Sequence, residues 1–407
     1  MADIDVAIVG AGAAGIAAGR RLADRGHNVL LIDSLDRVGG RAWTTSVDSL
    51  PLDLGCGWLH SAERNPWVNV AEAAGFAVDR TEAAWRDQLR NLGFSASERK
   101  AAEEAFVAFN RRLAEDPPAS DRASDALPDD PTWHCYLESM SGYINGAGLT
   151  DLSVADYVAY DEAASELNWR VPAGYGALIA HAARALPASL HTHVEAIAFD
   201  DTGVRLTTTK GSIAARAAIV TIPTDVLARG AIRLPAAFDR ICDAASKLPL
   251  GLADKLFLKI ADPDSVPPES HLLGNPHRAR TGSYYIRPFG RPVIECFLGG
   301  TTARTLEAAG GDAALTLARE ELGALLGADF ARGLTPIAAS AWAKVPSIGG
   351  SYSHALPGHA AAREVLTAEI DERIAFAGEA CSLTDFSTAH GAYQSGIAAA
   401  GRIEACL

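Results

Sequence analysis

The chain has 407 residues, enough for two or three domains, and 48% of them are hydrophobic, so it can bury a large core. Lys and Arg number 36 and Asp and Glu number 50, which gives a formal net charge of −14. Because nucleic acid is bound by basic surfaces, this balance argues against a nucleic-acid-binding protein. The sequence has no apolar stretch of about 18 residues or more, so we expect no membrane span.

The six cysteines are scattered, with no C-x-x-C pair. This distribution is typical of reduced, mostly buried thiols in a cytoplasmic protein, and no cluster of metal ligands accompanies it. A strand is predicted to start at Ile4, so we expect no signal peptide. Neither composition nor spacing predicts an oligomeric state.

A glycine-rich turn near the N-terminus is the first motif. The apolar run Val6–Val9 is typical of a strand buried on both faces, and Gly10, Gly12 and Gly15 follow it as G-x-G-x-x-G. In this motif the first glycine permits a tight turn, the second lets the backbone approach a pyrophosphate, and the third lets the helix pack closely on the strand. The sequence therefore predicts a strand, a turn and a helix whose N-terminus binds phosphate.

A second strand over residues 28–32 completes this unit and ends at Asp33. Asp33 lies 18 positions after Gly15, about where a carboxylate that accepts a ribose hydroxyl is found in dinucleotide-binding folds. A tight turn without a ligand is the alternative for the glycines alone, but the complete unit favours a dinucleotide site.

The segment Arg37-Val38-Gly39-Gly40-Arg41 follows directly. Here the chain resembles the FAD-dependent amine oxidase family, whose members carry an acid, a short spacer and G-G-R. In that family the arginine and the glycines line the FAD phosphates. An arginine suits this position because its planar guanidinium can bind phosphate oxygens with two hydrogen bonds.

Further segments carry the same resemblance in the family's order, and the W-x-H, N-P and G-S-Y-S stretches are most similar to the polyamine oxidase branch. The segments are Asp53–His60 with Asn65-Pro66, Pro172–Ile179, Ala218–Pro223, Pro249–Lys255, Gly349–Ser353, Ile374–Glu379 and Thr388–Gly396.

The resemblance implies an α/β fold, in which an FAD-binding Rossmann-like domain of the glutathione-reductase type is interleaved with a substrate domain of mixed sheet and helices. The FAD-binding domain is expected over 1–80, 170–247 and 345–407, and the substrate-binding domain over 81–169 and 248–344. Within the substrate domain, Ser95–Glu98 is a predicted capping box that starts a helix ending before Pro117. We expect an exposed loop over 119–131 and a second helical region over 132–143.

Non-covalent FAD is the cofactor that the resemblance implies. Mitochondrial monoamine oxidases carry a cysteine at the Ser351 position that bonds to the flavin, and a serine cannot form that thioether. The residues expected to contact FAD are Gly10, Gly12, Ala14, Gly15, Asp33, Ser34, Gly39, Gly40, Arg41, Gly55, Cys56, Gly57, Trp58, Val194, Gly378, Glu379 and Ala389.

Lys255 and His60 are the predicted catalytic residues. Alternation along residues 255–260 places Lys255 on a solvent-facing side of a strand. The P-L-G-x-x-x-K match instead implies that Lys255 holds a water against flavin N5, and we favour this role. For His60 a packed histidine and a residue of the substrate channel are both open.

Three further residues are predicted to bind substrate. Trp342 and Tyr352 wall the cavity or are ordinary core aromatics. Thr388 stands where monoamine oxidases place a tyrosine of their aromatic cage, so a cage of two tyrosines is not expected here.

The implied activity is hydride transfer from the carbon beside a neutral amine to flavin N5, hydrolysis of the imine, and reoxidation by O2 to give H2O2. The expected partners are O2 and a small amine, a polyamine or another aliphatic or secondary amine. Three alternatives remain open: a flavin desaturase acting on an apolar substrate, an L-amino-acid or monoamine oxidase of the same fold, and a flavoprotein that serves only as an interaction module.

Overall fold

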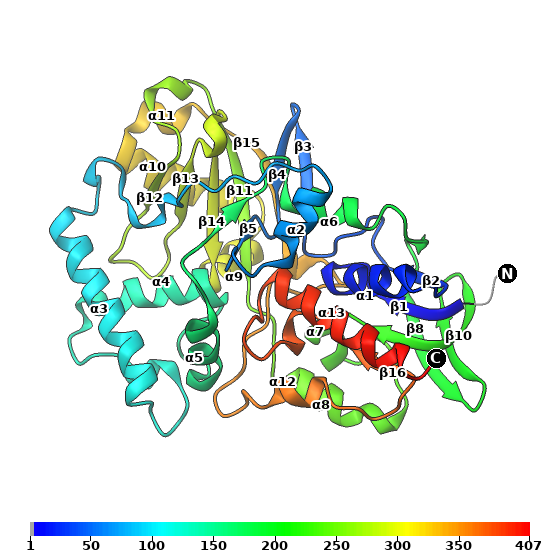
Figure 1. Ribbon diagram of the computed structural model, residues 1–407. Coiled ribbons are helices and arrows are strands. Elements are labelled where there is room, and N and C mark those ends of the chain that lie inside the picture. Colours follow the sequence, from blue (N-terminus) through cyan, green and yellow to red (C-terminus); the bar gives the residue numbers. More distant parts are fainter. Residues whose placement is uncertain (1–3) are drawn as a thin grey trace.

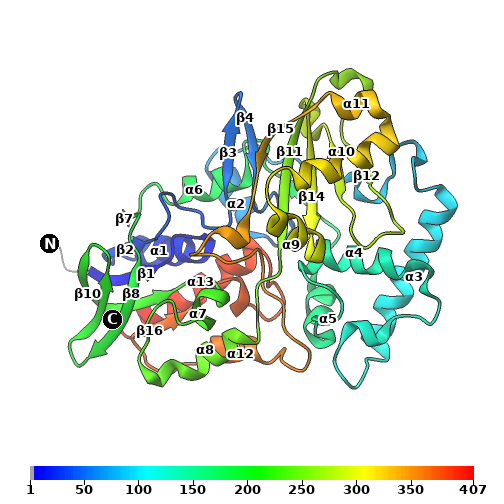
Figure 2. The same cartoon turned by 180° about the vertical axis from the view of Figure 1, so that it is seen from behind.

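The computed structural model describes residues 4–407, and two β-sheets organise it into two lobes (Figures 1 and 2). Residues 1–3, the start of the predicted first domain segment, lie outside the described residues. The C-terminus lies on the lobe built around the first sheet, at the right of Figure 1. Among residues 4–407 no helix is long and apolar enough to cross a bilayer.

The first sheet is largely parallel and has the N-terminal strand near its centre. Its strands are β7 (Ala188–Ser189), β2 (Val29–Ile32), β1 (Ile4–Val9), β10 (Gly211–Val220), β9 (Gly203–Thr208) and β8 (Val194–Asp200), in this spatial order, with β16 (Ile374–Phe376) pairing the far end of β10. β7, β2, β1, β10 and β16 pair in parallel, whereas β10, β9 and β8 form an antiparallel meander. The α/β fold is thus confirmed.

Both faces of this sheet are covered, which explains the continuous apolar run of β1. Val6 and Ile8 pack under α1 (Ala13–Asp24) and α13 (Ala389–Glu404), which lie side by side (blue and red in Figure 1). Ala7 and Val9 pack on the other face, towards α8 (Asp239–Ser246) and α12 (Ala362–Leu366). The sequence reads as hydrophobic on every position because neither face meets water.

The turn from β1 into α1 depends on two glycines. Gly10 has φ +106°, a conformation that residues with a side chain rarely adopt. A Cβ on Gly15 would lie 2.0 Å from the Gly10 carbonyl oxygen, so the helix can begin this close to the strand only with glycine there. The packing role predicted for Gly15 matches this geometry.

The second sheet is antiparallel throughout. Its spatial order is β12 (Ser270–Leu273), β13 (Ser283–Ile286), β14 (Val293–Gly299), β11 (Ala253–Ile260) and β15 (Leu334–Ala339). One face packs on α10 (Ala313–Leu326) through the alternating side chains of β11, including Leu256 and Leu258. The other face of β11 turns towards the first lobe, where Phe257 packs on Leu52 and Leu54.

The solvent-facing position that alternation gives Lys255 is wrong. β11 lies between β14 and β15 and is covered on both faces, and Lys255 is only 6% exposed. Only Lys259, near the end of the strand, reaches solvent. Alternation of apolar and polar residues identifies a strand with one exposed face. It cannot show that the face with the charged residue is buried as well.

The helices of the substrate lobe lie at the left of Figure 1. The predicted capping box is confirmed: Ser95 accepts a hydrogen bond from the Glu98 amide, Glu98 accepts one from the Ser95 amide, and α3 (Ala96–Glu115) follows. The predicted second helical region contains a short 3-10 turn and α4 (His134–Asn145). The exposed loop over 119–131 is wrong in part, because a 3-10 turn buries Ala123 and Ala126 in a local core.

One short hairpin, one further two-stranded antiparallel sheet and the remaining helices complete the structure. They are β3 (Thr44–Val47) with β4 (Leu50–Asp53), β5 (Trp58–Leu59) with β6 (Trp169–Arg170), α2 (Pro66–Ala73), α5 (Val154–Ala163), α6 (Tyr175–Ala182), α7 (Thr224–Ala228), α9 (Gly300–Ala309) and α11 (Ala328–Arg332). Every described strand of the first sheet falls inside the segments predicted to bind FAD, and every strand of the second falls inside 248–344. The domain boundaries themselves stay a prediction.

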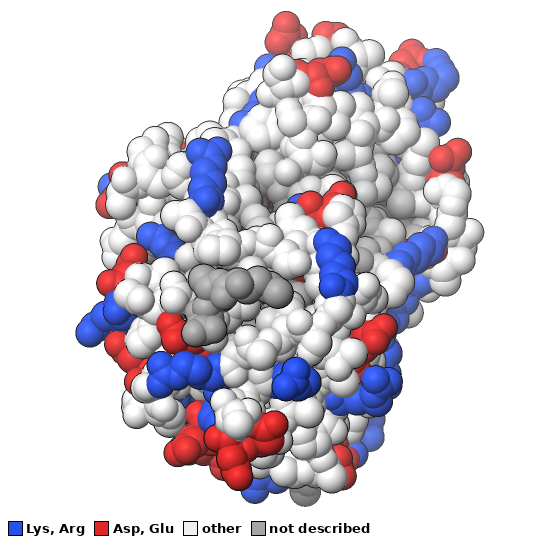
Figure 3. Space-filling view, turned by 90° about the vertical axis from the view of Figure 1, so that its right-hand side faces the viewer, with Lys and Arg blue, Asp and Glu red and all other residues white. Residues whose placement is uncertain are grey.

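Figure 3 shows the end of the first lobe, where a group of acidic side chains stands together at the bottom of the view. There, among the described residues, Lys and Arg side chains are separated by Asp, Glu and uncharged side chains, so this face has no continuous basic surface.

A buried ion pair joins the two lobes. The Arg363 guanidinium on α12 binds both carboxylate oxygens of Asp156 on α5, at 2.5 and 2.8 Å, and both side chains are at most 2% exposed. Such a pair is costly to break because the remaining charge is left without a partner in a medium of low polarity.

We expect Arg363→Met to lower the free energy of unfolding by about 3–5 kcal/mol, because it leaves the Asp156 carboxylate buried and unpaired. Urea unfolding of the purified protein measures this loss. Lys100→Met is the control, since the exposed Lys100–Glu104 pair should contribute less than about 1 kcal/mol. Equal losses in the two variants would contradict the structural role of the pair.

Candidate active site

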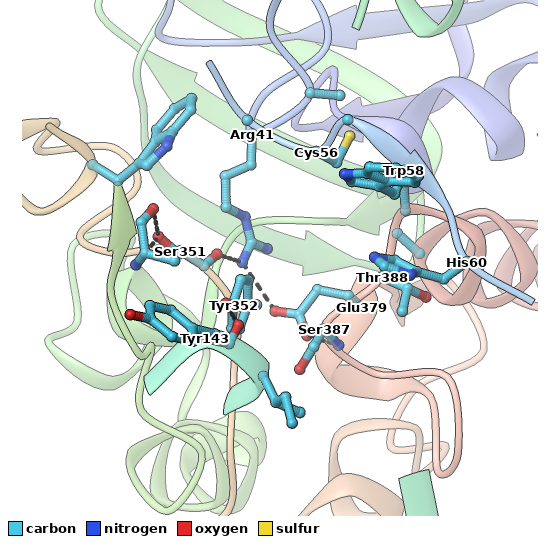
Figure 4. Close-up of a pocket in the computed structure, with 18 of the residues that line it drawn as sticks. Arg41, Cys56, Trp58, His60, Tyr143, Ser351, Tyr352, Glu379, Ser387 and Thr388 are labelled. Carbon is cyan, nitrogen blue, oxygen red and sulfur yellow. Dashed lines mark hydrogen bonds and ion pairs between the residues drawn. The ribbon is translucent and has the colours of Figure 1, made fainter. Parts of the chain in front are cut away.

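A cavity of about 1590 Å³ lies between the two sheets, and both lobes line it. It is larger than the roughly 300–1,000 Å³ that a drug-sized ligand usually occupies, so it has room for a dinucleotide and a second molecule. It brings together every predicted site residue except Gly15, which lies behind the turn. Figure 4 shows part of its wall.

The turn after β1 fits a phosphate group. The residue before α1 is Gly12, and no side chain caps the first turn of the helix. A Cβ at Gly12 would have no neighbour closer than 3.9 Å, so the space beside the helix start is open. Ala13 and Ala14 line the cavity here, and free helix N–H groups favour an anion such as a pyrophosphate.

Asp33 lines the same part of the cavity and also holds the turn together. Its carboxylate accepts hydrogen bonds from the amides of Ala11, at 2.7 Å, and Leu35, at 2.9 Å. Burial raises the pKa of Asp33, and the two backbone N–H groups act in the opposite direction. Each oxygen can accept a further hydrogen bond, as a ribose hydroxyl would require. Ser34 and Val194 line the cavity beside it.

Arg41 points across the cavity towards Ser351 and Glu379 (Figure 4). One terminal nitrogen binds the Ser351 carbonyl oxygen and lies 3.0 Å from Glu379 Oε1. Glu379 accepts a hydrogen bond from the Ser353 hydroxyl, which accepts one from Arg363, and Arg363 in turn binds Asp156. Burial would raise the pKa of Glu379, but the two arginines hold it below its usual range. The chain of contacts fixes Arg41 while its other N–H groups stay available to an anion.

The side-chain amine of Lys255 lies next to the backbone of residues 55–60. Its Nζ is 2.7 Å from Glu295 Oε1, an ion pair whose angle is too poor for a hydrogen bond. A Cβ added to Gly57 would lie 3.0 Å from Nζ, so this amine also touches the backbone of that segment. Lys255 and Glu295 come from adjacent strands, β11 and β14, and both line the cavity.

His60 is held as a neutral ring. Its Nδ1 lies 2.6 Å from Asn168 Oδ1, which accepts the Nδ1 proton and leaves the lone pair on Nε2. Burial lowers the pKa of His60 to about 4, and the positive charge of Lys255 acts in the same direction. At neutral pH this residue can accept a proton or a hydrogen bond but carries no charge.

Trp58 is fixed by a stack of aromatic and cationic groups. Its ring centroid lies 4.3 Å from that of Trp85 and 5.9 Å from that of Tyr285. The Arg170 guanidinium packs 4.9 Å from the Trp58 ring centroid and pairs with Asp79 and Glu269. Trp58 therefore forms a rigid wall of the cavity next to Gly57 and His60.

The three predicted substrate contacts line the cavity in different ways. Trp342 is almost wholly buried, donates its ring N–H to the Leu54 carbonyl and lines the cavity, and its role in substrate binding stays a prediction. The Tyr352 hydroxyl donates to the Tyr143 carbonyl. Thr388 caps α13: its hydroxyl accepts from the Gly391 amide and donates to the Asp385 carbonyl. No phenol stands at position 388.

The sequence reasoning missed several residues of the wall. Glu295, Trp85 and Tyr143 line the cavity, as do Phe106 and Val107 of α3. Phe106 lies on the same helical face as the buried residues Ala102 and Phe109, and this spacing is typical of a core residue. It cannot show that the core borders a cavity. Glu295 carries no local signal, because only strand pairing brings it to Lys255.

All six cysteines are free among the described residues, but the expectation that most are buried is wrong, since only Cys296 is. Cys56 lines the cavity, and burial raises its pKa to about 12, so it is a neutral thiol. Within residues 4–407 no group of three His, Cys, Asp or Glu side chains could hold a metal ion.

Comparisons with known proteins agree with this geometry. The model of a family described as flavin containing amine oxidoreductase matches residues 66–404, and one described as NAD(P)-binding Rossmann-like domain matches residues 8–71. Polyamine oxidase 4 of Oryza sativa subsp. japonica is 28% identical over 97% of this chain and 87% of the relative. Polyamine oxidase 2 of Arabidopsis thaliana is 27% identical over the same shares.

One relative belongs to a different branch, and a solved structure shares the fold. Lysine-specific histone demethylase 1B of Mus musculus is 24% identical over 98% of this chain but only 53% of its own length. A structure of wild-type putrescine oxidase bound to putrescine superposes with a TM-score of 0.79 over 99% of both chains, at 18% identity. Since the first family model covers most of the sequence, the chain belongs to the family of flavin-containing amine oxidoreductases, as the motifs from Gly10 to Thr388 predicted.

Proposed function

We propose that this protein is an FAD-dependent oxidase of a small aliphatic amine that uses O2 and releases H2O2. Bound FAD supplies the acceptor for the hydride from the amine α-carbon and passes the electrons on to O2. The observation that carries the proposal is the buried Lys255 amine beside Gly57, within the cavity that joins the two lobes. The polyamine oxidases among the relatives support an amine as the substrate.

The residues around the cavity have separate tasks in this proposal. The turn at Gly10–Ala14 and Arg41 bind the phosphates, and Asp33 accepts a ribose hydroxyl. Trp58 and His60 line the place of the amine, where the neutral His60 ring offers an acceptor without adding positive charge. Lys255 holds a water and places a positive charge near the reacting atoms, and Glu295 fixes the direction of its side chain.

The FAD is proposed to be bound without a covalent link. Ser351 stands where relatives with covalent flavin have a cysteine, and its hydroxyl is used within the protein: it accepts from the Ala253 amide and donates to the Ala253 carbonyl, both at 2.8 Å. Acid denaturation should therefore release all yellow colour into the supernatant. Flavin absorbance that stays with the washed pellet would contradict this, and Cys56 in the cavity wall would be the first candidate for the bond.

The activity itself is tested by anaerobic reduction of the flavin with a panel of amines. The panel contains spermine, spermidine, their acetylated forms, putrescine and simple aryl-alkyl amines, and an amine that bleaches the flavin should also produce H2O2 in air. An L-amino acid and an apolar polyene are included. If only one of these two reduces the flavin, the protein is an amino acid oxidase or a desaturase of the same fold, and the proposal fails.

We also propose that the protein works in the cytoplasm. The free cysteines support this, because thiols stay reduced in that compartment.

A further inference from the structure

A second, much smaller cavity adjoins the large one, and we call it the side cavity. Its volume is about 30 Å³, which is enough for about two water molecules. Four of the described residues line both cavities, namely Gly57, Trp58, Tyr285 and Glu295. Of these, Glu295 carries a charge, and the charged groups of Asp53, Arg170 and Arg291 also line the side cavity. Such a wall is polar enough to hold water.

Within residues 4–407, Arg170 has two buried hydrogen-bond donors, Nε and Nη1, that no protein atom accepts. The residue is 4% exposed, and its Nη2 pairs with Asp79 and Glu269, at 2.7 and 2.8 Å. Three aromatic rings pack on the guanidinium, and the nearest is that of Phe289 at 4.2 Å, but a ring accepts an N–H only weakly. Because buried donors are nearly always paired with protein atoms or ordered water, these two indicate water in the side cavity.

The wall of the side cavity also offers acceptors to such water. The Asp53 carboxylate accepts hydrogen bonds from the Thr44 hydroxyl and from two backbone amides, which leaves about one of its four lone-pair positions free. The Glu295 carboxylate lies 2.7 Å from Lys255 Nζ, but at an angle too poor for a hydrogen bond, so its lone pairs stay available. Water in the side cavity therefore finds donors on Arg170 and acceptors on Asp53 and Glu295.

The side cavity connects the Lys255 amine with the surface. Burial raises the pKa of Asp53 and the positive charge of Lys255 opposes this rise, because the two groups lie close together. Glu295 is next to Lys255 and lines both cavities. On the other side, Phe289 and Arg291 are partly exposed, so water can exchange between the side cavity and the solvent.

Formation of H2O2 needs one proton more than the hydride supplies. The hydride that leaves the amine α-carbon contains two electrons and one proton, whereas O2 takes up two electrons and two protons. The second proton must therefore come from the solvent and reach the large cavity. Lys255, with its ammonium group inside that cavity, is able to give it.

We propose that the side cavity is a water site from which Glu295 passes protons to Lys255. When an N–H bond of Lys255 breaks and an O–H bond of the peroxide forms, the amine regains a proton from Glu295. Glu295 in turn takes one from the water, which exchanges with the solvent. This inference rests on the proposed use of O2, and it assigns to Glu295 a second task besides fixing the Lys255 side chain.

A crystal structure of the FAD-bound protein, at a resolution that shows ordered water, tests the site directly. We expect density for water within hydrogen-bond distance of Arg170 Nε or Nη1. Val293→Ile should remove this water, because Val293 is a buried residue of β14 that lines the side cavity and isoleucine adds one methylene there. Val293→Thr is the matched control, since threonine has the shape of valine and leaves the space open. A side cavity without water in the unmodified protein would overturn the proposal.

The proton transfer is tested by reoxidation of the flavin. The flavin is reduced by light instead of an amine, so the measurement does not depend on the substrate, and stopped-flow spectroscopy follows its reoxidation by O2 in H2O and in D2O. Reoxidation should be about tenfold slower in Val293→Ile, with a larger solvent isotope effect, because the arrival of the proton becomes limiting. Val293→Thr should keep the unmodified rate, and anaerobic reduction by an amine should be unchanged in both variants.

A second variant keeps the test decisive if the larger residue at position 293 disturbs the fold. Glu295→Gln has nearly the same shape but cannot take up a proton, so it should slow reoxidation by a similar factor while the water remains visible in the crystal structure. If reoxidation keeps its unmodified rate in a variant that has lost the water or the carboxylate, the proton transfer is overturned and the proposed oxidase function stands. If O2 does not reoxidise the reduced flavin in the unmodified protein, the oxidase function itself fails, and the proton transfer fails with it.

Discussion

Lys255→Met should slow the flavin half-reactions by roughly 10²-fold while the protein keeps its fold and its FAD. Lys255 is the charged side chain that reaches the cavity from the middle of β11, and its amine touches the Gly57 backbone. Methionine has nearly the same length and fills the same space, so packing against β14 and β15 is kept. The variant loses a positive charge and the hydrogen-bond donor of the proposed water. Preorganised sites use such groups to stabilise developing charge.

Stopped-flow spectroscopy measures reduction by the amine and reoxidation by O2 separately in this variant. Lys259→Met is the matched control, because Lys259 is on the same strand but exposed and paired with Asp48 at the surface. Bound FAD should be unchanged in both variants, whereas the unfolding midpoint should fall only in Lys255→Met, which leaves the mostly buried Glu295 carboxylate without its partner. If Lys255→Met runs both half-reactions at the unmodified rate, the lysine has only a structural role and the proposed water has another holder.

Glu295 decides how Lys255 is presented, since the two groups lie 2.7 Å apart. Removing the carboxylate would leave the Lys255 amine beside Asp53, whose own carboxylate is held by Thr44 and the Tyr175 amide. The Lys255 side chain is thus positioned by an ion pair between strands. This relation is visible only once β11 and β14 are paired.

Local motifs made the first lobe predictable. The strand, the turn at Gly10 and the packing of Gly15 all follow from residues that are neighbours in the sequence, and so does the capping box at Ser95. Each of these motifs depends on interactions within about one turn of backbone, so a single sequence is enough to recognise it.

The position of Lys255 could not be predicted from alternation, because β15 and the β3–β4 hairpin cover β11 from distant parts of the chain. The part of the cavity wall that α3 forms could not be predicted either. Phe106 has the helical period of a core residue, and Val107 beside it looks like an ordinary surface residue. Only the placement of α3 against α4 shows that both line one cavity. Tertiary packing, and no local rule, sets these positions.

Flavin reduction should accelerate with pH because only a neutral amine can release a hydride from its α-carbon. A protonated amine has no lone pair to stabilise the positive charge that develops on that carbon. An alkylamine with a pKa of about 10.4 is almost wholly protonated at pH 7. Its neutral fraction rises about tenfold per pH unit up to pH 9. The ratio of the limiting reduction rate to the dissociation constant should therefore rise about 100-fold over this range.

Asp254 is the group with a shifted pKa that titrates at the low end of that window, since burial and the neighbouring Glu307 raise its pKa to about 7, but it does not line the cavity. Burial lowers the pKa of His60 and His271 to about 4, so both rings are neutral throughout. Burial raises the pKa of Cys56 to about 12 and raises that of Tyr352 as well, so both keep their protons. The rise should thus follow the substrate, and desolvation among the aromatic walls favours its neutral form.

An amine of lower pKa separates the substrate from the enzyme as the source of this profile. With a fluorinated alkylamine of similar shape, the rate should level off near the pKa of that amine, whereas an enzyme group would give the same inflection with both substrates. His60→Gln should keep the shape of the profile even where it lowers the rates, since the ring is neutral from pH 7 to 9. A profile that is flat, or whose inflection is the same for both amines, would show that a group of the protein takes the proton. The carboxylates of Glu295 and Asp161, which line the cavity, would then be the next to replace.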